Sequence, residues 1–580
     1  MQAELLTYEP PARSALERGE ILLAELERNP TNANALDDLG VFAMENDAVD
    51  DAIELFHRAI HLAGPRAPFC AHLGEAFTRR GDYIRAAACI EQALVEQPAE
   101  IELRFALANL QHVSGSYALA EENYQQVVNQ EPGHWEAWFN LGVTRTIGRK
   151  VDLAKAAYQT AVSIRPMYAE AWNNLALLEH SAGDLAAAEA CYRRGLLVDP
   201  DYHDSLYNFA LLLQEQERVQ EAIVIYERLL QLAPGLAEAH NNLGNSYLKL
   251  NRLADAKAHF YEALAANAAH REAPWNLGFA YLLDGDFRNG WAGYEHRLAQ
   301  HEIRRQDWRV PRWDGRLHRG QRVLVHHEQG LGDTIQFARY LAMLDQGGLE
   351  VEVLCQKPLL RLLRRLPFVR VCEADSKHLE AADWQVPFPS LAYHFGSTIE
   401  TIPNESPYLF VDPACKQEWV NLFSHLSPSQ LKVGLVWQGN PKHRNDHNRS
   451  LPPSLLEPLL SISGVQFLGL QKNVERSSIP TGIRDLSPLL GDLMETSAAI
   501  ECLDLVISVD TAVAHLAGAL GKPVWLLLPF APDWRWLLHR EDSPWYPSMR
   551  IFRQPIIGDW RSVIQAVKQA VKHELAKTVA

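Results

Sequence analysis

One segment in the second half of the chain combines two glycines with a carboxylate at the expected start of a helix. Residues 323–334 read Val-Leu-Val-His-His-Glu-Gln-Gly-Leu-Gly-Asp-Thr, which predicts a strand, a turn and a helix. Gly330 and Gly332 would let the backbone approach a ligand, because neither carries a β-carbon. Asp333 is either a simple helix cap or a functional carboxylate. Dinucleotide-binding and P-loop fingerprints are both absent from the segment.

A second segment, residues 503–523, has the form of an anion site. A buried strand is expected to end at Ser508, and a helix is expected to begin at Thr511 with free backbone N–H groups. Thr511 would add a hydroxyl, and His515 lies one turn along on the same face. A lone histidine on an apolar helix is more often a core residue, but the Asp-Thr-Ala-x-x-His spacing favours a site for phosphate.

A basic loop between these two segments offers further positive charge. Residues 433–450 predict a strand that runs into a loop with Lys442, Arg444 and Arg449. On an acidic chain such a loop suits a phosphate group, although a solvated charged loop is the simpler interpretation. Gln471, at the end of the next expected strand, would face the same edge.

The elements that must position these residues have the pattern of an α/β fold. Short apolar runs alternate with helical stretches from Gln321 onward, which indicates βαβ units and parallel sheets. The expected strands are 322–326, 350–354, 432–437, 465–470, 504–508 and 523–528, and the expected helices are 333–345, 491–502, 511–520 and 560–578. We expect two lobes, 321–430 and 431–580, preceded by a linker over 305–320.

The first half repeats with a period of 34 residues. Alanine recurs at one position of the repeat, in Ala52, Ala86, Ala120, Ala154, Ala188, Ala222 and Ala256, and proline closes units at Pro98, Pro132, Pro166, Pro200 and Pro234. Small residues let two helices approach closely, and proline ends the second helix. The pattern matches the tetratricopeptide (TPR) motif in eight copies from about residue 33 to residue 304, with a partial leading helix over 14–29 in a TPR domain of residues 1–304.

One polar column runs through five consecutive repeats: Asn140, Asn174, Asn208, Asn242 and Asn276. Side-chain amides can hold the backbone of an extended peptide without reading its sequence. The column resembles the asparagine ladder in the TPR arm of nucleocytoplasmic O-GlcNAc transferases. Asparagine is also common at this position of TPR units, so a structural role is the alternative.

Composition excludes several classes of protein. The 580 residues carry a net charge of −17, which does not suit a nucleic-acid binder. The first ten residues lack the pattern of a signal peptide, and no apolar run is long enough to span a bilayer. The seven cysteines show no CxxC pair, so reduced thiols and a cytoplasmic location are expected.

The three segments of the second half, in this order, resemble the heptosyltransferase-like branch of GT-B glycosyltransferases. Together with the repeats, the whole chain resembles bacterial TPR–glycosyltransferase proteins, a group that includes flagellin glycosyltransferases. The resemblance implies an α-solenoid of TPR helical hairpins followed by a GT-B pair of Rossmann-like lobes. It also implies a nucleotide-activated sugar as donor and no metal or other cofactor.

Carried onto this sequence, the resemblance assigns roles to individual residues. Asp333 matches the general base, while Thr511, Ala512 and His515 match the helix start that holds the donor diphosphate, with Asp510 near the sugar. Lys442, Arg444 and Arg449 would be phosphate partners, and the Asn column would hold the acceptor peptide. Trp534, Arg535 and Trp536 either close over the donor or form a packed aromatic corner.

Three functions fit these expectations. The first is transfer of a sugar to Ser or Thr of a protein, including flagellin, that the repeats recruit. The second is a TPR scaffold with an inactive GT-B half, and the third is transfer to a glycan or lipid. The sequence names neither the sugar nor the nucleotide base, which could be that of CMP, UDP, GDP or ADP.

Overall fold

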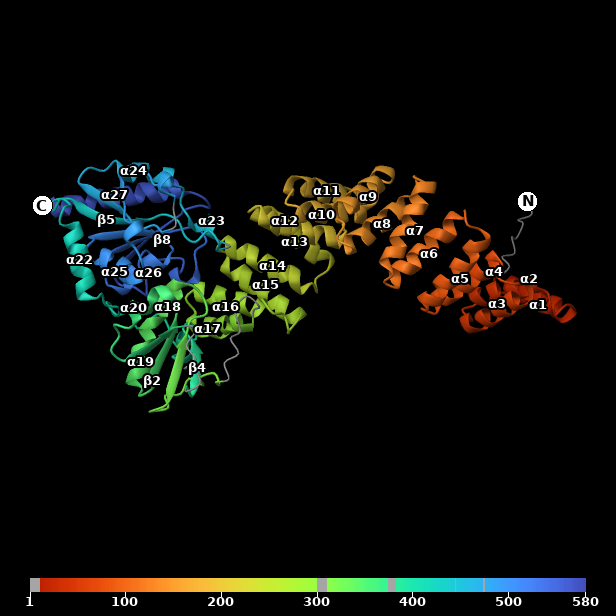
Figure 1. Ribbon diagram of the computed structural model, residues 1–580, viewed down its shortest axis with the longest axis horizontal. Helices are drawn as coiled ribbons and strands as arrows, with labels where there is room; N and C mark the ends of the chain where they lie inside the picture. The colour runs from red at the N-terminus through yellow and green to blue at the C-terminus, as the bar shows by residue number, and fades with distance from the viewer. Residues whose placement is uncertain (1–10, 300–309, 374–381, 444, 473–474, 580) are drawn as a thin grey trace, which may run out of the picture. The chain divides into compact units, whose positions relative to one another are not determined.

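The computed structural model describes residues 11–299, 310–373, 382–443, 445–472 and 475–579, and forms two compact units, Met1–Gln216 and Glu217–Ala580 (Figure 1). The first unit is a series of helical hairpins. Its helices are α1 Pro11–Arg28, α2 Ala33–Glu45, α3 Val49–Ala63, α4 Ala67–Arg79, α5 Tyr83–Glu96, α6 Ile101–Val113, α7 Tyr117–Gln130, α8 Trp135–Ile147, α9 Val151–Ile164, α10 Ala169–Ser181, α11 Leu185–Val198 and α12 His203–Glu215.

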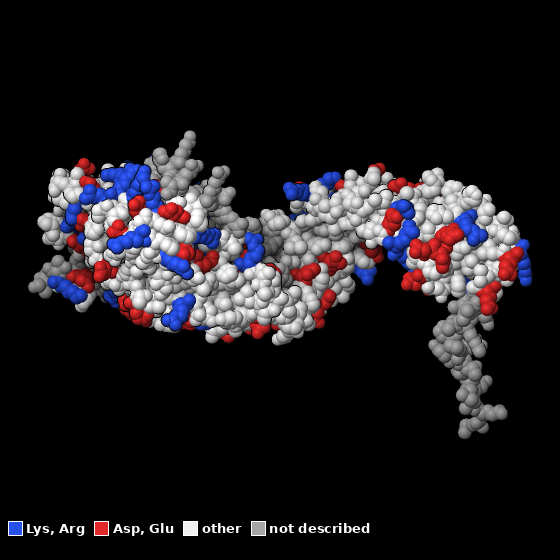
Figure 2. All heavy atoms as spheres, turned by 90° about the horizontal axis from the view of Figure 1, so that it is seen from below, with Lys and Arg blue, Asp and Glu red and all other residues white. Residues whose placement is uncertain are grey.

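The hairpins close because the small residues of the repeat leave room for rings. A β-carbon on Gly40 of α2 would lie 2.5 Å from Cε1 of Phe56 in α3, and one on Gly142 would lie 2.7 Å from the ring of Tyr158. The recurring alanine is fully buried in each hairpin, as Ala52 and Ala154 show. Acidic and basic side chains lie side by side on the surface of these repeats (Figure 2), where Arg80 pairs with Asp50 at 3.3 Å. The predicted TPR solenoid is confirmed.

The second unit begins with the last helices of the repeat series. These are α13 Val219–Leu232, α14 Ala237–Lys249, α15 Leu253–Ala266, α16 Ala273–Leu283 and α17 Phe287–Tyr294, followed by the 3-10 turn η1 Glu295–Ala299. Phe287, Trp291 and Tyr294 belong to the same hydrophobic cluster as strand and loop residues of the second half. Trp291 also donates its indole N–H to the carbonyl oxygen of Ser397 at 2.7 Å. The compact units therefore divide within the repeats, whereas the sequence placed a domain boundary at residue 304.

The next part of the second unit is built on a four-stranded parallel sheet of order β3-β2-β1-β4. Its strands are β1 Arg322–His326, β2 Glu350–Cys355, β3 Val369–Glu373 and β4 Trp384–Pro387, and its helices are α18 Leu331–Phe337, α19 Leu341–Gln346, α20 Leu360–Leu363 and α21 Ser390–His394. The middle of the expected linker pairs with the edge of this sheet, because the amide of Trp313 donates to the carbonyl of Gln385 at 2.9 Å.

The last part holds a six-stranded parallel sheet of order β10-β9-β8-β5-β6-β7. Its strands are β5 Leu431–Val436, β6 Val465–Gly469, β7 Ile483–Asp485, β8 Leu505–Val509, β9 Val524–Leu528 and β10 Met549–Arg553, and its helices are α23 Asp446–Arg449, α24 Glu457–Leu460, α25 Leu493–Glu501, α26 Ala512–Ala519 and α27 Trp560–Val579. Both sheets confirm the predicted α/β fold.

The structure differs from the expected elements in two respects. Strands β3, β4, β7 and β10 were not anticipated, because they are three to five residues long and carry polar residues. Helix α22, Pro413–Phe423, lies before the expected lobe boundary at 430. It packs on α25 of the six-stranded lobe, where Trp419 donates its indole N–H to Glu495 at 2.9 Å.

In each sheet, successive strands are added first on one side of an inner strand and then on its other side. In the first sheet β2 and β3 lie on one side of β1, and β4 lies on the other. In the second sheet the reversal falls between β5 and β8. Ligands of open parallel sheets bind beyond the carboxyl ends of strands at such points. The turns after β1, β5 and β8 are therefore the places to examine for a site.

Candidate functional site

Asp333 lies in the first turn of α18, directly beyond β1. One carboxylate oxygen accepts a hydrogen bond of 2.8 Å from the backbone N–H of Gly330, and the other accepts from a guanidinium N–H of Arg535. The Asp333 side chain is 17% exposed and lines a cavity. The structure shows the helix-cap interpretation, because Asp333 closes the first turn of α18. Its carboxylate also lines the cavity, and a functional role for it stays a prediction.

Arg535 joins this turn to the six-stranded lobe. It is nearly buried and also pairs with Asp533 at 2.7 Å, while its Nε donates to Gln336 at 2.6 Å. Burial opposes its charge, but the two carboxylates raise the pKa of Arg535 well above its ordinary value. Trp534 and Trp536 on either side are 1% and 0% exposed, as expected for a packed aromatic corner.

The start of α26 faces the cavity from the six-stranded lobe. Thr511 is extended, with φ −143° and ψ 167°, and its side chain makes no capping hydrogen bond to the helix. Its hydroxyl lies 3.0 Å from the hydroxyl of Ser508. The first amide groups of a helix have no acceptor within the helix, so Thr511 and Ala512 present N–H groups to an anion.

Asp510 and His515 flank this helix start. Burial and the nearby carboxylate of Asp533 raise the pKa of Asp510 to about 6. The imidazole Nε2 of His515 lies 3.9 Å from Asp510, and its Nδ1 lies 2.9 Å from the hydroxyl of Tyr546. Burial, with the positive charge of Arg535, lowers the pKa of His515 well below its ordinary value. The His515 imidazole is therefore neutral, and it lies beside Asp510 and Tyr546 near the start of α26.

The two turns contact each other through Gly332 and His515. A β-carbon on Gly332 would lie 2.9 Å from Cδ2 of the imidazole. Gly330 and Gly332 both line the cavity, and their role in a close backbone approach to a ligand stays a prediction. The glycine at 332 is therefore required by the packing of α18 against α26.

The basic loop after β5 reaches the cavity only in part. Arg449 lines it and donates to the backbone carbonyl of Asp510 at 3.2 Å and to Asp446 at 3.1 Å. Lys442 is exposed and does not line the cavity, and Arg444 lies outside the described residues. Gln471 lines the cavity and binds the loop backbone, because its carbonyl oxygen accepts from the amide of Gln438 at 3.0 Å.

All these surfaces meet in one cavity of about 1500 Å³. Its first wall is the Asp333 turn, and its second consists of the α26 start and the β5 loop. Its third wall belongs to the repeats, whose lining residues are Glu238, Asn267, Ala269, His270, Arg271, Glu272, Trp275, Phe279 and Tyr294. Sequence reasoning missed this wall, because nothing in the repeat pattern separates Trp275 and Phe279 from core positions.

The Asn column is half-buried throughout. In the first unit Asn208 donates to the side chain of Asn173 at 3.3 Å, and Asn140 donates to Asn109 at 3.0 Å. In the second unit Asn276 donates to Asn241 at 2.9 Å. These bonds join adjacent repeats and use part of the hydrogen-bonding capacity of each amide. Asn174 accepts from Asn173 at 3.3 Å, and Asn242 is also half-buried, so peptide binding by the column stays a prediction.

Within the described ranges, no cluster of three or more His, Cys, Asp or Glu side chains could hold a metal ion. Among the same residues, no helix is long and apolar enough to cross a membrane. The absence of a cofactor and the cellular location stay predictions.

The two parts of the chain match two kinds of protein family. Tetratricopeptide repeat models match residues 73–128, 105–145, 148–196, 213–260 and 241–288. The model described as glycosyltransferase family 9 (heptosyltransferase) matches residues 470–527, a segment that contains β8, Asp510 and the whole of α26. The chain is thus a TPR-repeat protein with a heptosyltransferase-like segment near its C-terminus.

Particular relatives add to this description. The chain is 29% identical over 324 residues to Protein FlbA of Caulobacter vibrioides, a match that covers 50% of this chain and 53% of that protein. The chain therefore spans about half the length of this curated relative. Among solved structures, YrrB, described as a TPR protein with an unusual peptide-binding site, is 18% identical with a TM-score of 0.31, and covers 33% of this chain and 98% of its own. A TPR repeat-containing protein from Cytophaga hutchinsonii is 17% identical with a TM-score of 0.36, covering 41% and 98%.

Proposed function

We propose that this chain is an inverting GT-B glycosyltransferase that moves a sugar from a nucleotide-activated donor to a hydroxyl group of a protein. The observation that carries the proposal is the single cavity with three walls. It brings together an accessible carboxylate, a helix start suited to phosphate and a face of the repeat series. The heptosyltransferase-like match includes the α26 part of the second wall.

The donor would lie against the six-stranded lobe. The amide groups of Thr511 and Ala512 and the guanidinium of Arg449 would bind its phosphates, since both kinds of donor stabilise negative charge. Asp510 would lie near the sugar, and Gln471 would hold the β5 loop in place. The proposal requires no metal, because these groups can supply the positive charge that the leaving phosphate needs.

Asp333 would act as general base on the opposite side. Its carboxylate would remove the proton of the acceptor hydroxyl as the oxygen forms a bond to the anomeric carbon. The bond from that carbon to the phosphate oxygen breaks, and its electron pair leaves with the nucleotide. Attack from the face opposite the phosphate inverts the configuration at the sugar.

The wall of the repeats favours a protein acceptor. A pocket for one small ligand usually measures about 300 to 1000 Å³, whereas this cavity measures about 1500 Å³. The additional space is bounded by α14 and α16, whose acidic and aromatic side chains include Glu238, Trp275 and Phe279. An extended Ser- or Thr-bearing segment held along the repeats would reach Asp333 through this space.

The first test is a thermal-shift panel with CMP, UDP, GDP and ADP on the wild type and on Ala512→Pro. Ala512 is the first residue of α26 and follows an extended residue, so proline fits the backbone there and removes one N–H group. A nucleotide at about 100 times its dissociation constant should stabilise the wild type by about 2.7 kcal/mol, and the variant should bind it about 10-fold more weakly, as expected for the loss of a charge-assisted hydrogen bond. No shift with any nucleotide at millimolar concentration would favour an inactive scaffold.

A further inference from the structure

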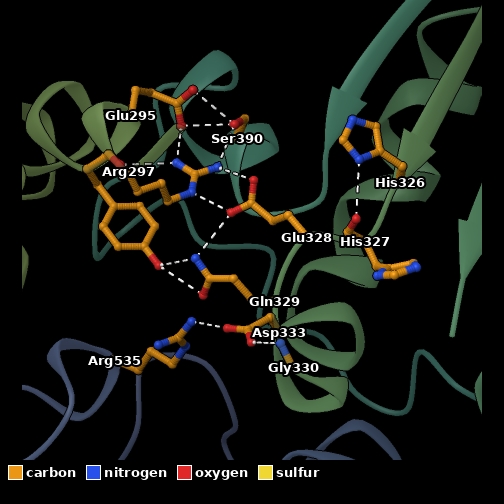
Figure 3. A network of polar contacts seen from close by, with 11 residues as sticks. Glu295, Arg297, His326, His327, Glu328, Gln329, Gly330, Asp333, Ser390 and Arg535 are labelled. Carbon is orange, nitrogen blue, oxygen red and sulfur yellow. Dashed lines mark hydrogen bonds and ion pairs between the residues drawn. The ribbon is translucent and has the colours of Figure 1, made fainter. Parts of the chain in front are cut away.

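A buried arginine at the end of the repeats binds the turn that carries Asp333. Arg297 is fully buried in η1. Its Nε donates to Glu328 at 2.5 Å and one terminal nitrogen donates to the second oxygen of the same carboxylate at 3.2 Å (Figure 3). Arg297 also donates to Glu295 at 2.5 Å, to the hydroxyl of Ser390 at 2.7 Å and to the backbone carbonyl of Tyr294 at 3.2 Å. The guanidinium therefore joins the repeat series to α21 and to the turn after β1.

Glu328 does not line the cavity, but the next five residues do. Its carboxylate is 3% exposed, and it accepts a hydrogen bond of 3.2 Å from the side chain of Gln329. The hydroxyl of Tyr294 lies 3.4 Å from the amide nitrogen of Gln329, so a second residue of the repeats binds the same turn. The contacts continue from Arg297 through Glu328 to the backbone that presents Asp333 (Figure 3).

The far side of the turn is held by the four-stranded lobe itself. Gln356 donates to the backbone carbonyl of Gln329 at 3.0 Å and accepts from the hydroxyl of Thr334 at 3.0 Å. The turn is thus fixed from both sides, and one of those sides is the repeat series. Burial of a charged pair costs free energy unless its hydrogen bonds are well aligned. The bidentate contact of Arg297 with the Glu328 carboxylate provides two such bonds.

We propose that Arg297 and Glu328 are positioning residues for the Asp333 turn, so that the last repeat is an integral part of the transferase site. This inference rests on the proposed function. Neither side chain contacts a ligand, and both act through the backbone of residues 329–333. Loss of the contact displaces the carboxylate of Asp333 without altering the phosphate-binding turn on the other lobe.

The experiment compares full-length variants of two buried arginines, each paired with a glutamate. Arg297→Met removes the contact, and Arg297→Lys keeps the charge without the planar fork. The control is Arg145→Met, which breaks the pair between Arg145 and Glu121, 3.2 Å apart, in the first unit. The double variant Arg297→Met/Glu328→Gln removes both charges of the pair. It should fold even if Arg297→Met alone, which leaves the buried Glu328 carboxylate without its arginine, does not.

Positioning predicts a loss in kcat with little change in donor affinity. A displacement of about 1 Å costs about 10²-fold in rate, so we expect that loss for Arg297→Met and a smaller one for Arg297→Lys. The double variant should unfold at a higher temperature than Arg297→Met yet stay as slow. A double variant that regains wild-type kcat, or an Arg297→Met enzyme as active as Arg145→Met, would overturn the inference.

Hydrogen exchange separates this inference from the proposed function. Backbone amides of residues 326–333 should exchange at least tenfold faster in Arg297→Met than in Arg145→Met, whether or not any transfer is observed. Unchanged exchange would reject the coupling. A wild type that binds no nucleotide and transfers no sugar, but shows the exchange difference, would reject the proposed function alone.

Discussion

The turns after β1 and β8 have the same backbone form and opposite chemistry. Each follows an inner strand of a parallel sheet and opens a helix, and the two helix starts touch at Gly332 and His515. In the first turn the third helical residue, Asp333, binds back to the amide of Gly330. In the second turn the helix begins Ala-Val-Ala, and its N-cap residue Thr511 makes no side-chain capping hydrogen bond. One or two side chains therefore decide whether such a turn presents a carboxylate or an uncapped helix start.

Removing the carboxylate of the first turn should have the largest effect. Asp333→Asn should lower the transfer rate by about 10²- to 10⁴-fold, the usual contribution of a general base. Donor affinity should stay unchanged, because the proposed phosphate-binding groups lie on the other turn. Steady-state kinetics with calorimetric donor binding would check both expectations.

The control for this variant is Asp533→Asn. It removes the other carboxylate partner of Arg535 and leaves the proposed base in place. It should slow transfer far less than Asp333→Asn while lowering thermal stability to a similar extent. Equal loss of activity in the two variants would mean that the ion pairs of Arg535, and not the base, account for the effect.

Forcing the two turns apart should have the next largest effect. Gly332→Ala places a β-carbon 2.9 Å from the imidazole of His515, so α18 and α26 must separate. Overpacking of this kind costs about 1–3 kcal/mol, and the misplaced base should slow transfer by about 10²-fold. Gly133→Ala is the matched control, because a β-carbon there meets nothing within 4 Å. Melting curves and rates of both variants test the requirement for glycine at 332.

The smallest expected effect concerns the charge of the second turn. Burial and Asp533 raise the pKa of Asp510 to about 6, so the carboxyl is neutral at pH 5 and ionised at pH 8. Ionisation places a negative charge beside the phosphate site, and donor affinity should fall about fivefold as pH rises through 6, which corresponds to about 1 kcal/mol of screened repulsion.

Calorimetry with an intact nucleotide sugar tests this dependence, because the phosphates of such a donor do not titrate in this range. Asp510→Asn should bind the donor equally well at both pH values. The same pKa shift has a consequence for folding: the folded chain binds more protons than the unfolded chain between about pH 4 and 6, so this group makes the protein less stable as pH rises through that range. If Asp510→Asn kept the full pH dependence of donor binding, that dependence would belong to another titrating group.

Elements that depend on local sequence patterns were predicted well. The period of 34 residues identified the hairpins, and the apolar runs located β1, β2, β5, β6, β8 and β9 to within a residue or two. The strands that were missed, such as β7, are too short or too polar to show periodicity. Asp333, Asp510 and Thr511 follow β1 and β8 and line one cavity, in agreement with the rule that ligands of parallel sheets bind beyond the carboxyl ends of strands. Their individual roles stay predictions.

By itself the sequence determined the hairpins, the two parallel sheets and the chemistry available at the ends of their strands, since periodicity and strand–turn–helix order are local properties. Only the tertiary structure decided which groups face each other across the cavity. Arg535 meets Asp333 from 202 positions away, and Arg297 reaches the hydroxyl of Ser390 from 93 positions away. Such partners depend on how the helices of the repeats pack against the sheets, because a buried charge is stable only where the completed core supplies its counter-charge.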